Sequence, residues 1–114
     1  MTFPRRGEVY WVSLDPTVGT EIQKTRPAVI VSNDIGNELS ARVIIAPMTS
    51  QGTQRVFPFE VLVPAGEGGL RETSKIAMDQ LRSVDRLRLG DKMGALTPER
   101  MDLVHRAIRI TFSV

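Results

Sequence analysis

The hydrophobic residues of this sequence fall into short runs rich in β-branched and aromatic side chains, a pattern typical of strands. Two runs, 27–32 and 42–48, are almost continuously apolar, which indicates strands buried on both faces. Along 57–63 the hydrophobic residues alternate, so this strand is expected to turn one face to the core. The predicted strands are residues 8–14, 27–32, 42–48, 57–63, 74–79 and, as a short sixth, 83–86.

One helix is predicted near the C-terminal end of the sequence. Thr97 is a suitable N-cap, Pro98 fits the first helical position, and Glu99 favours the positive end of the helix dipole. Apolar residues then recur at helical spacing, at Met101, Val104, Ala107 and Ile108. A short helical turn fits residues 33–39. The elements together indicate an all-β (mainly β) protein, a small barrel with one packed helix.

Length and composition favour a single soluble domain covering residues 1–114. Hydrophobic residues make up 41% of the 114, enough for one core. No apolar run approaches the ~18 residues of a membrane helix. No apolar stretch follows the charged residues 5–6, so no signal peptide is predicted, and a cytoplasmic location is expected. The net charge is only +2, but the segment from Gln80 onward carries seven basic and four acidic residues, which is compatible with a polyanionic partner.

The residue types present limit the possible chemistry. The chain has no cysteine, and its single histidine, His105, lies in the predicted helix. Thiolate sites, a two-histidine ribonuclease and a multi-histidine metal site are therefore excluded. Any reaction must be carried by Asp, Glu, Arg, Lys, Ser, Thr or Tyr.

Three polar stretches lie next to predicted strands: the loop 16–25 with Arg26 after it, the strand end at 47–51, and residues 79–81. Arg26 comes directly before a core strand and is therefore expected to be rigidly placed. It could serve as a charge that orients a ligand, or it could pair with a nearby carboxylate and close the end of the barrel. Pro47 cannot donate to a ladder, so the strand is expected to end or lie at an edge there. The hydroxyls of Thr49 and Ser50 could bind a phosphate oxygen, or they could hydrogen-bond to their own backbone in a local turn. Spacing alone leaves open whether the three stretches converge.

Several segments resemble the MazF/PemK family of toxin endoribonucleases, in order along almost the whole chain. They are RGEVYWV at 6–12, LDPT at 14–17, GTE at 19–21, TRPAVIVS at 25–32, APMTS at 46–50, PFEV at 58–61 and DQL at 79–81. The resemblance implies an SH3-like barrel of five to seven strands with a C-terminal helix, which forms a homodimer. It also implies a sequence-specific cleavage of single-stranded RNA, mostly messenger RNA, that needs no metal or other cofactor and arrests growth. A cognate antitoxin protein is the implied partner.

The resemblance also assigns site residues. The family's catalytic arginine and threonine correspond to Arg26 and Thr49, and its acidic loop residue to Glu21. Attack by the 2′-hydroxyl on phosphorus would give a 2′,3′-cyclic phosphate and a 5′-hydroxyl, with Arg26 as charge stabiliser and either Arg26 or Glu21 as base. The residues expected to grip RNA are Gln23, Lys24, Thr25, Ser50, Gln51, Arg55, Asp79 and Gln80.

Three other interpretations compete with this one. A non-catalytic nucleic-acid-binding module of the same fold would bind RNA without cutting it. A gyrase-poisoning toxin of similar fold would end in Trp-Gly-Ile, whereas this chain ends in TFSV and has its only tryptophan at Trp11. In the third interpretation, the aromatic residues form an exposed platform on which RNA bases stack. We expect these residues mostly in the core and the dimer interface instead.

Overall fold

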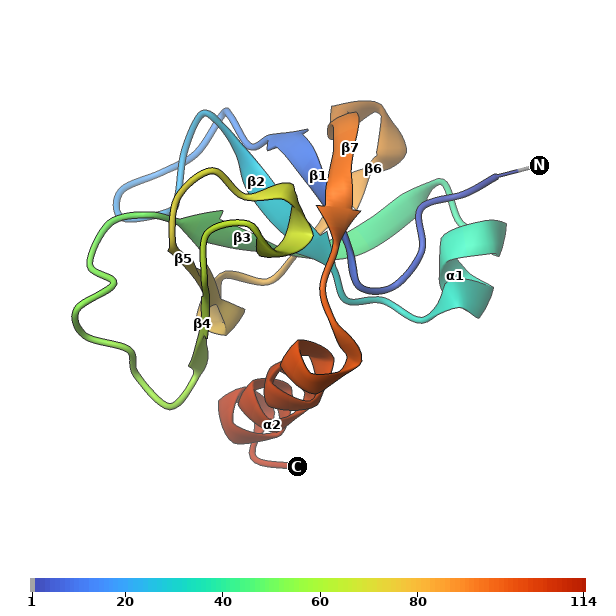
Figure 1. Ribbon diagram of the computed structural model, residues 1–114. Coiled ribbons are helices and arrows are strands. Elements are labelled where there is room, and N and C mark those ends of the chain that lie inside the picture. The colour runs from blue at the N-terminus through green and yellow to red at the C-terminus, as the bar shows by residue number, and fades with distance from the viewer. Residues whose placement is uncertain (1) are drawn as a thin grey trace.

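The computed structural model describes residues 2–114; Met1, the first residue of the predicted domain, lies outside them (Figure 1). Within this range the chain forms seven strands, two α-helices and three 3-10 helices. The strands are β1 (Glu8–Ser13), β2 (Thr25–Ile30), β3 (Arg42–Thr49), β4 (Glu60–Val63), β5 (Ser74–Ala77), β6 (Arg82–Asp85) and β7 (Leu89–Ala95). The helices are α1 (Asp34–Leu39), α2 (Pro98–Phe112), η1 (Glu67–Gly69), η2 (Met78–Gln80) and η3 (Arg86–Arg88). The predicted mainly β class with a C-terminal helix is confirmed.

The strands form one antiparallel sheet in the order β4-β5-β3-β2-β1-β7, with β6 paired to β3. Strand β3 changes partner along its length: Ile45 pairs with Arg82 of β6, and Met48 pairs with Ile76 of β5. Pro47 stands between these two ladders: it pairs with Ala28 of β2, and neither β5 nor β6 has a residue opposite it. Strand β3 does not end at Pro47 but two residues later, at Thr49. The alternative expectation, that Pro47 lies at an edge, fits the gap between the two ladders.

The core is aliphatic and lies on both faces of the sheet. Along β2, Ala28 and Ile30 belong to one hydrophobic cluster and Val29 to the other, and none of the three is exposed. The predicted two-faced burial of this strand is confirmed. Helix α2 covers one cluster with Val104 and Ala107, and contacts β4 and η2; Figure 1 shows it beneath the sheet. No helix within residues 2–114 combines the length and the apolar character needed to span a membrane.

The helix signals are confirmed in detail. The Thr97 hydroxyl accepts a hydrogen bond from the Arg100 amide at 3.1 Å, and Pro98 begins α2. Met101 and Ile108 pack against the core beside the two buried residues. His105 is exposed, so it takes no part in the interior.

One predicted strand starts too early, and one strand has no counterpart in the prediction. Strand β4 begins only at Glu60, since the Glu60 amide donates to the Phe57 carbonyl at 2.8 Å and closes a turn around Pro58. Phe57 and Phe59 stack on each other before the strand, with ring centres 5.5 Å apart. Strand β7 was not predicted, because glycines and charged residues interrupt its hydrophobic pattern. The expectation of aromatic residues in the core is wrong for this chain, since none of the six aromatic side chains is buried, while their place in a dimer interface stays a prediction.

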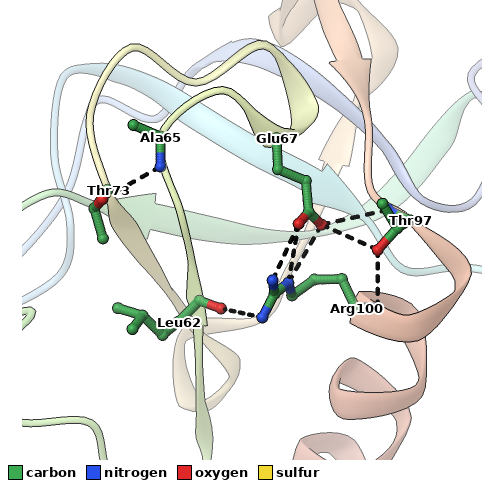
Figure 2. Close-up of polar contacts among 6 residues, drawn as sticks. All are labelled: Leu62, Ala65, Glu67, Thr73, Thr97 and Arg100. Atoms are coloured by element: carbon green, nitrogen blue, oxygen red, sulfur yellow. Dashed lines mark hydrogen bonds and ion pairs between the residues drawn. The ribbon is translucent and has the colours of Figure 1, made fainter.

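An ion-pair network fastens η1 to the start of α2 (Figure 2). Arg100 donates to the Glu67 carboxylate from Nε at 3.2 Å and from Nη2 at 3.1 Å, and from Nη1 to the Leu62 carbonyl at 3.0 Å. Thr97 donates to Glu67 Oε2 from its amide and its hydroxyl. Burial raises the pKa of Glu67, but the bonds from Arg100 and Thr97 and the guanidinium charge outweigh it, so the pKa is lowered overall.

Replacing Glu67 by Gln is expected to lower the free energy of unfolding by about 1–3 kcal/mol near neutral pH. Because the folded pKa lies below the unfolded value, the contribution of Glu67 is complete above pH 4.5 and is lost as the pH falls through the folded pKa. Chemical denaturation from pH 7 to pH 3 measures this: the difference between wild type and Glu67→Gln should shrink in acid. The control Glu38→Gln removes an exposed carboxylate from α1 and should differ little from wild type at any pH. A Glu67→Gln difference that stays constant down to pH 3 would contradict the assignment.

Candidate active site

A cavity of about 380 Å³ opens beside the ends of β2 and β3. Four residues predicted for the site line it: Thr25, Arg26, Thr49 and Ser50. Its apolar lining comes from Trp11, Pro27, Met48, Leu70 and Met93, and its remaining polar lining from Arg71, Glu72 and Ser74. Spacing along the chain does not decide whether the first two polar stretches converge, and in the structure residues of both line this cavity.

The strand register explains why Arg26 and Thr49 meet. Strands β2 and β3 are antiparallel, with Ala28 opposite Pro47. Extending this register by two residues along each strand places Arg26 opposite Thr49. Residues opposite each other on neighbouring strands have Cβ atoms roughly 4.5–5.5 Å apart. The sheet itself therefore positions both side chains at one end of the cavity.

Arg26 contributes a guanidinium that is free of carboxylates. Its Nε donates to the Gln23 carbonyl at 3.1 Å, which fixes the side chain against the preceding loop. Within residues 2–114 the ion pairs are Lys75–Glu60, Lys92–Glu8 and Arg100–Glu67, and none involves Arg26. The interpretation in which Arg26 closes the barrel end through an ion pair is therefore wrong. The positive charge stays available to an anion in the cavity.

Thr49 forms the local turn that its sequence suggested, because its hydroxyl accepts a hydrogen bond from the Gln51 amide at 3.1 Å. A hydroxyl has one donor and two acceptor positions, so this bond leaves the O–H of Thr49 able to donate. Ser50, the next residue, is exposed at the cavity edge. Arg26 and the Thr49 hydroxyl thus line the same space, which also holds a second arginine, Arg71, and one carboxylate, Glu72. Guanidinium and hydroxyl donors of this kind suit the oxygens of a phosphate.

Glu21 lies in a second cavity, of about 370 Å³, together with Asp79 and Gln80. Its carboxylate accepts a hydrogen bond from the Val18 amide at 2.6 Å and so is engaged with its own loop. The Gln80 side-chain oxygen accepts from the Ile22 amide at 2.7 Å and ties this loop to η2. The third polar stretch therefore converges with the loop 16–25, but not with the cavity that holds Arg26.

The remaining predicted residues line neither cavity. Gln23 and Lys24 are exposed on the loop, and Lys24 has a positive φ of 69°. Gln51 and Arg55 are exposed in the segment between β3 and β4, where the Arg55 guanidinium lies 5.0 Å from the centre of the Phe57 ring.

Part of the cavity wall was missed from the sequence. Trp11 is an aromatic residue expected in the core or the dimer interface. No local pattern singles out Arg71 and Glu72, which follow a glycine-rich loop, or Met93, which lies in strand β7. A glycine-rich segment and a charged edge strand give no local signal of a binding surface. Across residues 2–114, no group of three or more His, Asp or Glu side chains is arranged to hold a metal ion.

Comparison with known proteins assigns the family. The model of the PemK-like, MazF-like toxins of type II toxin–antitoxin systems matches residues 5–112. The chain belongs to this family. The resemblance read from the sequence segments is confirmed, and so is the class of activity, that of a MazF-like endoribonuclease toxin.

Two curated relatives of this MazF-like toxin are endoribonucleases. Endoribonuclease EndoA of Bacillus subtilis is 37% identical over 110 residues, which cover 96% of this chain and 95% of the relative. Endoribonuclease MazF of Staphylococcus saprophyticus is 36% identical over 110 residues, covering 96% and 92%. These relatives support the ribonuclease interpretation over the gyrase poison and the non-catalytic module.

Solved structures agree with the fold of the toxin. MazF from Deinococcus radiodurans superposes with a TM-score of 0.84 at 24% identity and full coverage of both chains. A mycobacterial endoribonuclease, solved in complex with its cognate antitoxin, gives a TM-score of 0.81 at 26% identity, covering 97% of this chain and 96% of the other.

Proposed function

We propose that this toxin cuts single-stranded RNA, mainly messenger RNA, at a specific sequence and without a metal ion, and that the cut is made in the cavity of Arg26 and Thr49. The observation that carries the proposal is that Arg26 of β2 and Thr49 of β3 line one open cavity, and that the guanidinium of Arg26 makes no ion pair within residues 2–114. A phosphodiester carries the charge that such a pair would bind. Cleavage of messenger RNA would stop translation and growth.

In the proposed reaction the 2′-oxygen forms a bond to phosphorus, and the bond from phosphorus to the 5′-oxygen breaks. The products are a 2′,3′-cyclic phosphate and a 5′-hydroxyl. A base takes the proton of the 2′-hydroxyl, and an acid returns one to the leaving oxygen. Arg26 stabilises the added negative charge through its planar fork, and the Thr49 hydroxyl donates to the same phosphate.

The base is either Arg26 or Glu21, and the two differ in what they require. Arginine has a pKa above ~12 in proteins, so Arg26 would accept a proton only after strong perturbation. Glu21 would first have to give up its bond to the Val18 amide, and its loop would have to leave the second cavity. Loop movement on RNA binding is therefore part of the glutamate route.

The flanking nucleotides are proposed to extend from the first cavity across the loop 16–25. The second cavity, with Asp79 and Gln80, offers base-edge donors and acceptors beside the loop. The other residues proposed to contact RNA are Gln23, Lys24, Thr25, Ser50, Gln51 and Arg55.

The proposed assembly is a cytoplasmic homodimer of one domain per chain, neutralised by a cognate antitoxin protein. Support comes from the solved complexes of related toxins, one a mycobacterial endoribonuclease with its antitoxin and others MazE-MazF assemblies of Deinococcus radiodurans.

The test is to incubate the purified chain, in excess EDTA, with long single-stranded RNAs of diverse sequence and to map the new ends. We expect discrete cuts at one short sequence, each leaving a 5′-hydroxyl and a cyclic phosphate. Cuts that appear only when a divalent metal is added would contradict the metal-free route. RNA that is bound but left intact would instead support the non-catalytic module.

A further inference from the structure

Trp11 is an exposed aromatic residue in an otherwise well-buried strand. It lies in the middle of β1, which has β2 on one side and β7 on the other. Val9 and Val12 of the same strand are completely buried, whereas Trp11 retains 36% of its surface. Large apolar side chains at the centre of a sheet normally pack against other elements, so this exposure requires a reason.

The reason lies in strand β7, which is irregular opposite Trp11. Tyr10 pairs with Lys92 and Val12 pairs with Leu89, so β7 places two residues, Gly90 and Asp91, against the single residue Trp11. This two-against-one count is that of a β-bulge, a feature that re-aims side chains next to functional sites. A Cβ atom on Gly90 would lie 3.4 Å from the Trp11 Cβ, so the glycine leaves this side of the tryptophan without a covering side chain.

Trp11 also lies next to the reaction site. It pairs with Pro27, and its neighbour Val12 pairs with Arg26. Together with Met48, Leu70 and Met93 it forms the apolar part of the cavity that Arg26 and Thr49 line. An uncovered aromatic ring in an apolar slot, one residue from a phosphate-binding charge, suits a nucleobase whose backbone is held at that charge.

We propose that Trp11 stacks on the nucleobase next to the cut phosphate and so contributes to substrate binding and sequence preference. This inference rests on the proposed ribonuclease function of the same cavity. The base packs against the ring and the apolar side chains beside it, while Arg26 binds the adjoining phosphate. Trp11 moves no proton; it sets which nucleotide is presented to Arg26 and Thr49.

The experiment uses the full chain and an oligonucleotide that spans the mapped cut sequence, with a 2′-O-methyl group in place of the attacking hydroxyl so that it binds without being cut. Since Trp11 is the only tryptophan, tryptophan fluorescence, excited selectively so that Tyr10 does not contribute, reports on this site alone. We expect saturable quenching on binding. Trp11→Ala should raise both Kd and KM by roughly 5- to 150-fold and change kcat much less. Trp11→Phe keeps an aromatic ring and should recover part of the lost affinity.

A set of oligonucleotides with one abasic position each identifies the stacked base. At the position of the stacked base, removing the base should weaken binding to the wild type but not to Trp11→Ala. The anisotropy of a labelled oligonucleotide measures this affinity. Thermal unfolding checks that each variant is folded. If wild type and Trp11→Ala cut and bind alike, with no quenching, the stacking is wrong although the ribonuclease proposal stands. If the wild type cuts no RNA at all, the proposed function fails and this inference with it.

Discussion

Replacing Arg26 by Ala is expected to lower the rate of RNA cleavage by about 10²–10³-fold and to abolish growth arrest, while the chain remains folded. The reason is electrostatic: the guanidinium lines the cavity, makes no ion pair within residues 2–114, and is the charge that would stabilise the extra negative charge on phosphorus. The measurements are kcat for a cleavable oligonucleotide in EDTA and colony growth under controlled expression. Thermal unfolding verifies the fold.

Two further variants separate the role of Arg26 from a general loss of charge. Arg26→Lys keeps the charge but loses the planar fork, so its rate should lie between those of wild type and Arg26→Ala. Arg42→Ala removes an exposed arginine at the other end of β3 and should cleave at the wild-type rate. An Arg26→Ala protein that is folded and still fully toxic, or that cleaves as fast as Arg42→Ala, would refute the role given to Arg26.

The sequence predicted where Arg26 and Thr49 lie relative to the strands, but not that both residues line one cavity. Each residue stands beside a strand whose apolar run could be read directly, and a family resemblance connected them. Their convergence depends on the β2–β3 register, which no local pattern specifies. The hydrogen bond from the Val18 amide to Glu21 is local, but the place of Glu21 in a separate cavity is a tertiary result, because the bond from the Ile22 amide to Gln80 ties the loop 16–25 to η2.

The parts of the fold that could not be predicted are those in which backbone contacts replace side-chain periodicity. Helix α2 follows its caps and its apolar spacing, and these are local signals. Strand β7 is an edge strand that contains Gly90 and Gly94 and a bulge, so its residues do not alternate. The same absence of side chains that conceals this strand in the sequence lets η1 approach it closely and leaves Trp11 uncovered.

Replacing Gly69 by Ala is expected to lower the free energy of unfolding by about 3 kcal/mol or more and the Tm by roughly 10 °C. Gly69 has a φ of +77°, which costs a residue with a Cβ about 1–2 kcal/mol. In addition, a Cβ at this position would lie 2.1 Å from the Met93 carbonyl oxygen, so η1 or β7 would have to move. Guanidinium and thermal unfolding measure the loss.

Gly66→Ala is the matched control for the steric part of this effect. Gly66 also has a positive φ, +97°, but no atom lies within 4 Å of the position its Cβ would take. It should therefore show only the conformational cost, about 1–2 kcal/mol, and the excess loss in Gly69→Ala measures the contact between η1 and β7. Equal losses in the two variants would mean that these elements separate at little cost. A real excess would show that the close contact between the backbones of η1 and β7 stabilises the fold beside Leu70 and Met93, two residues of the cavity wall.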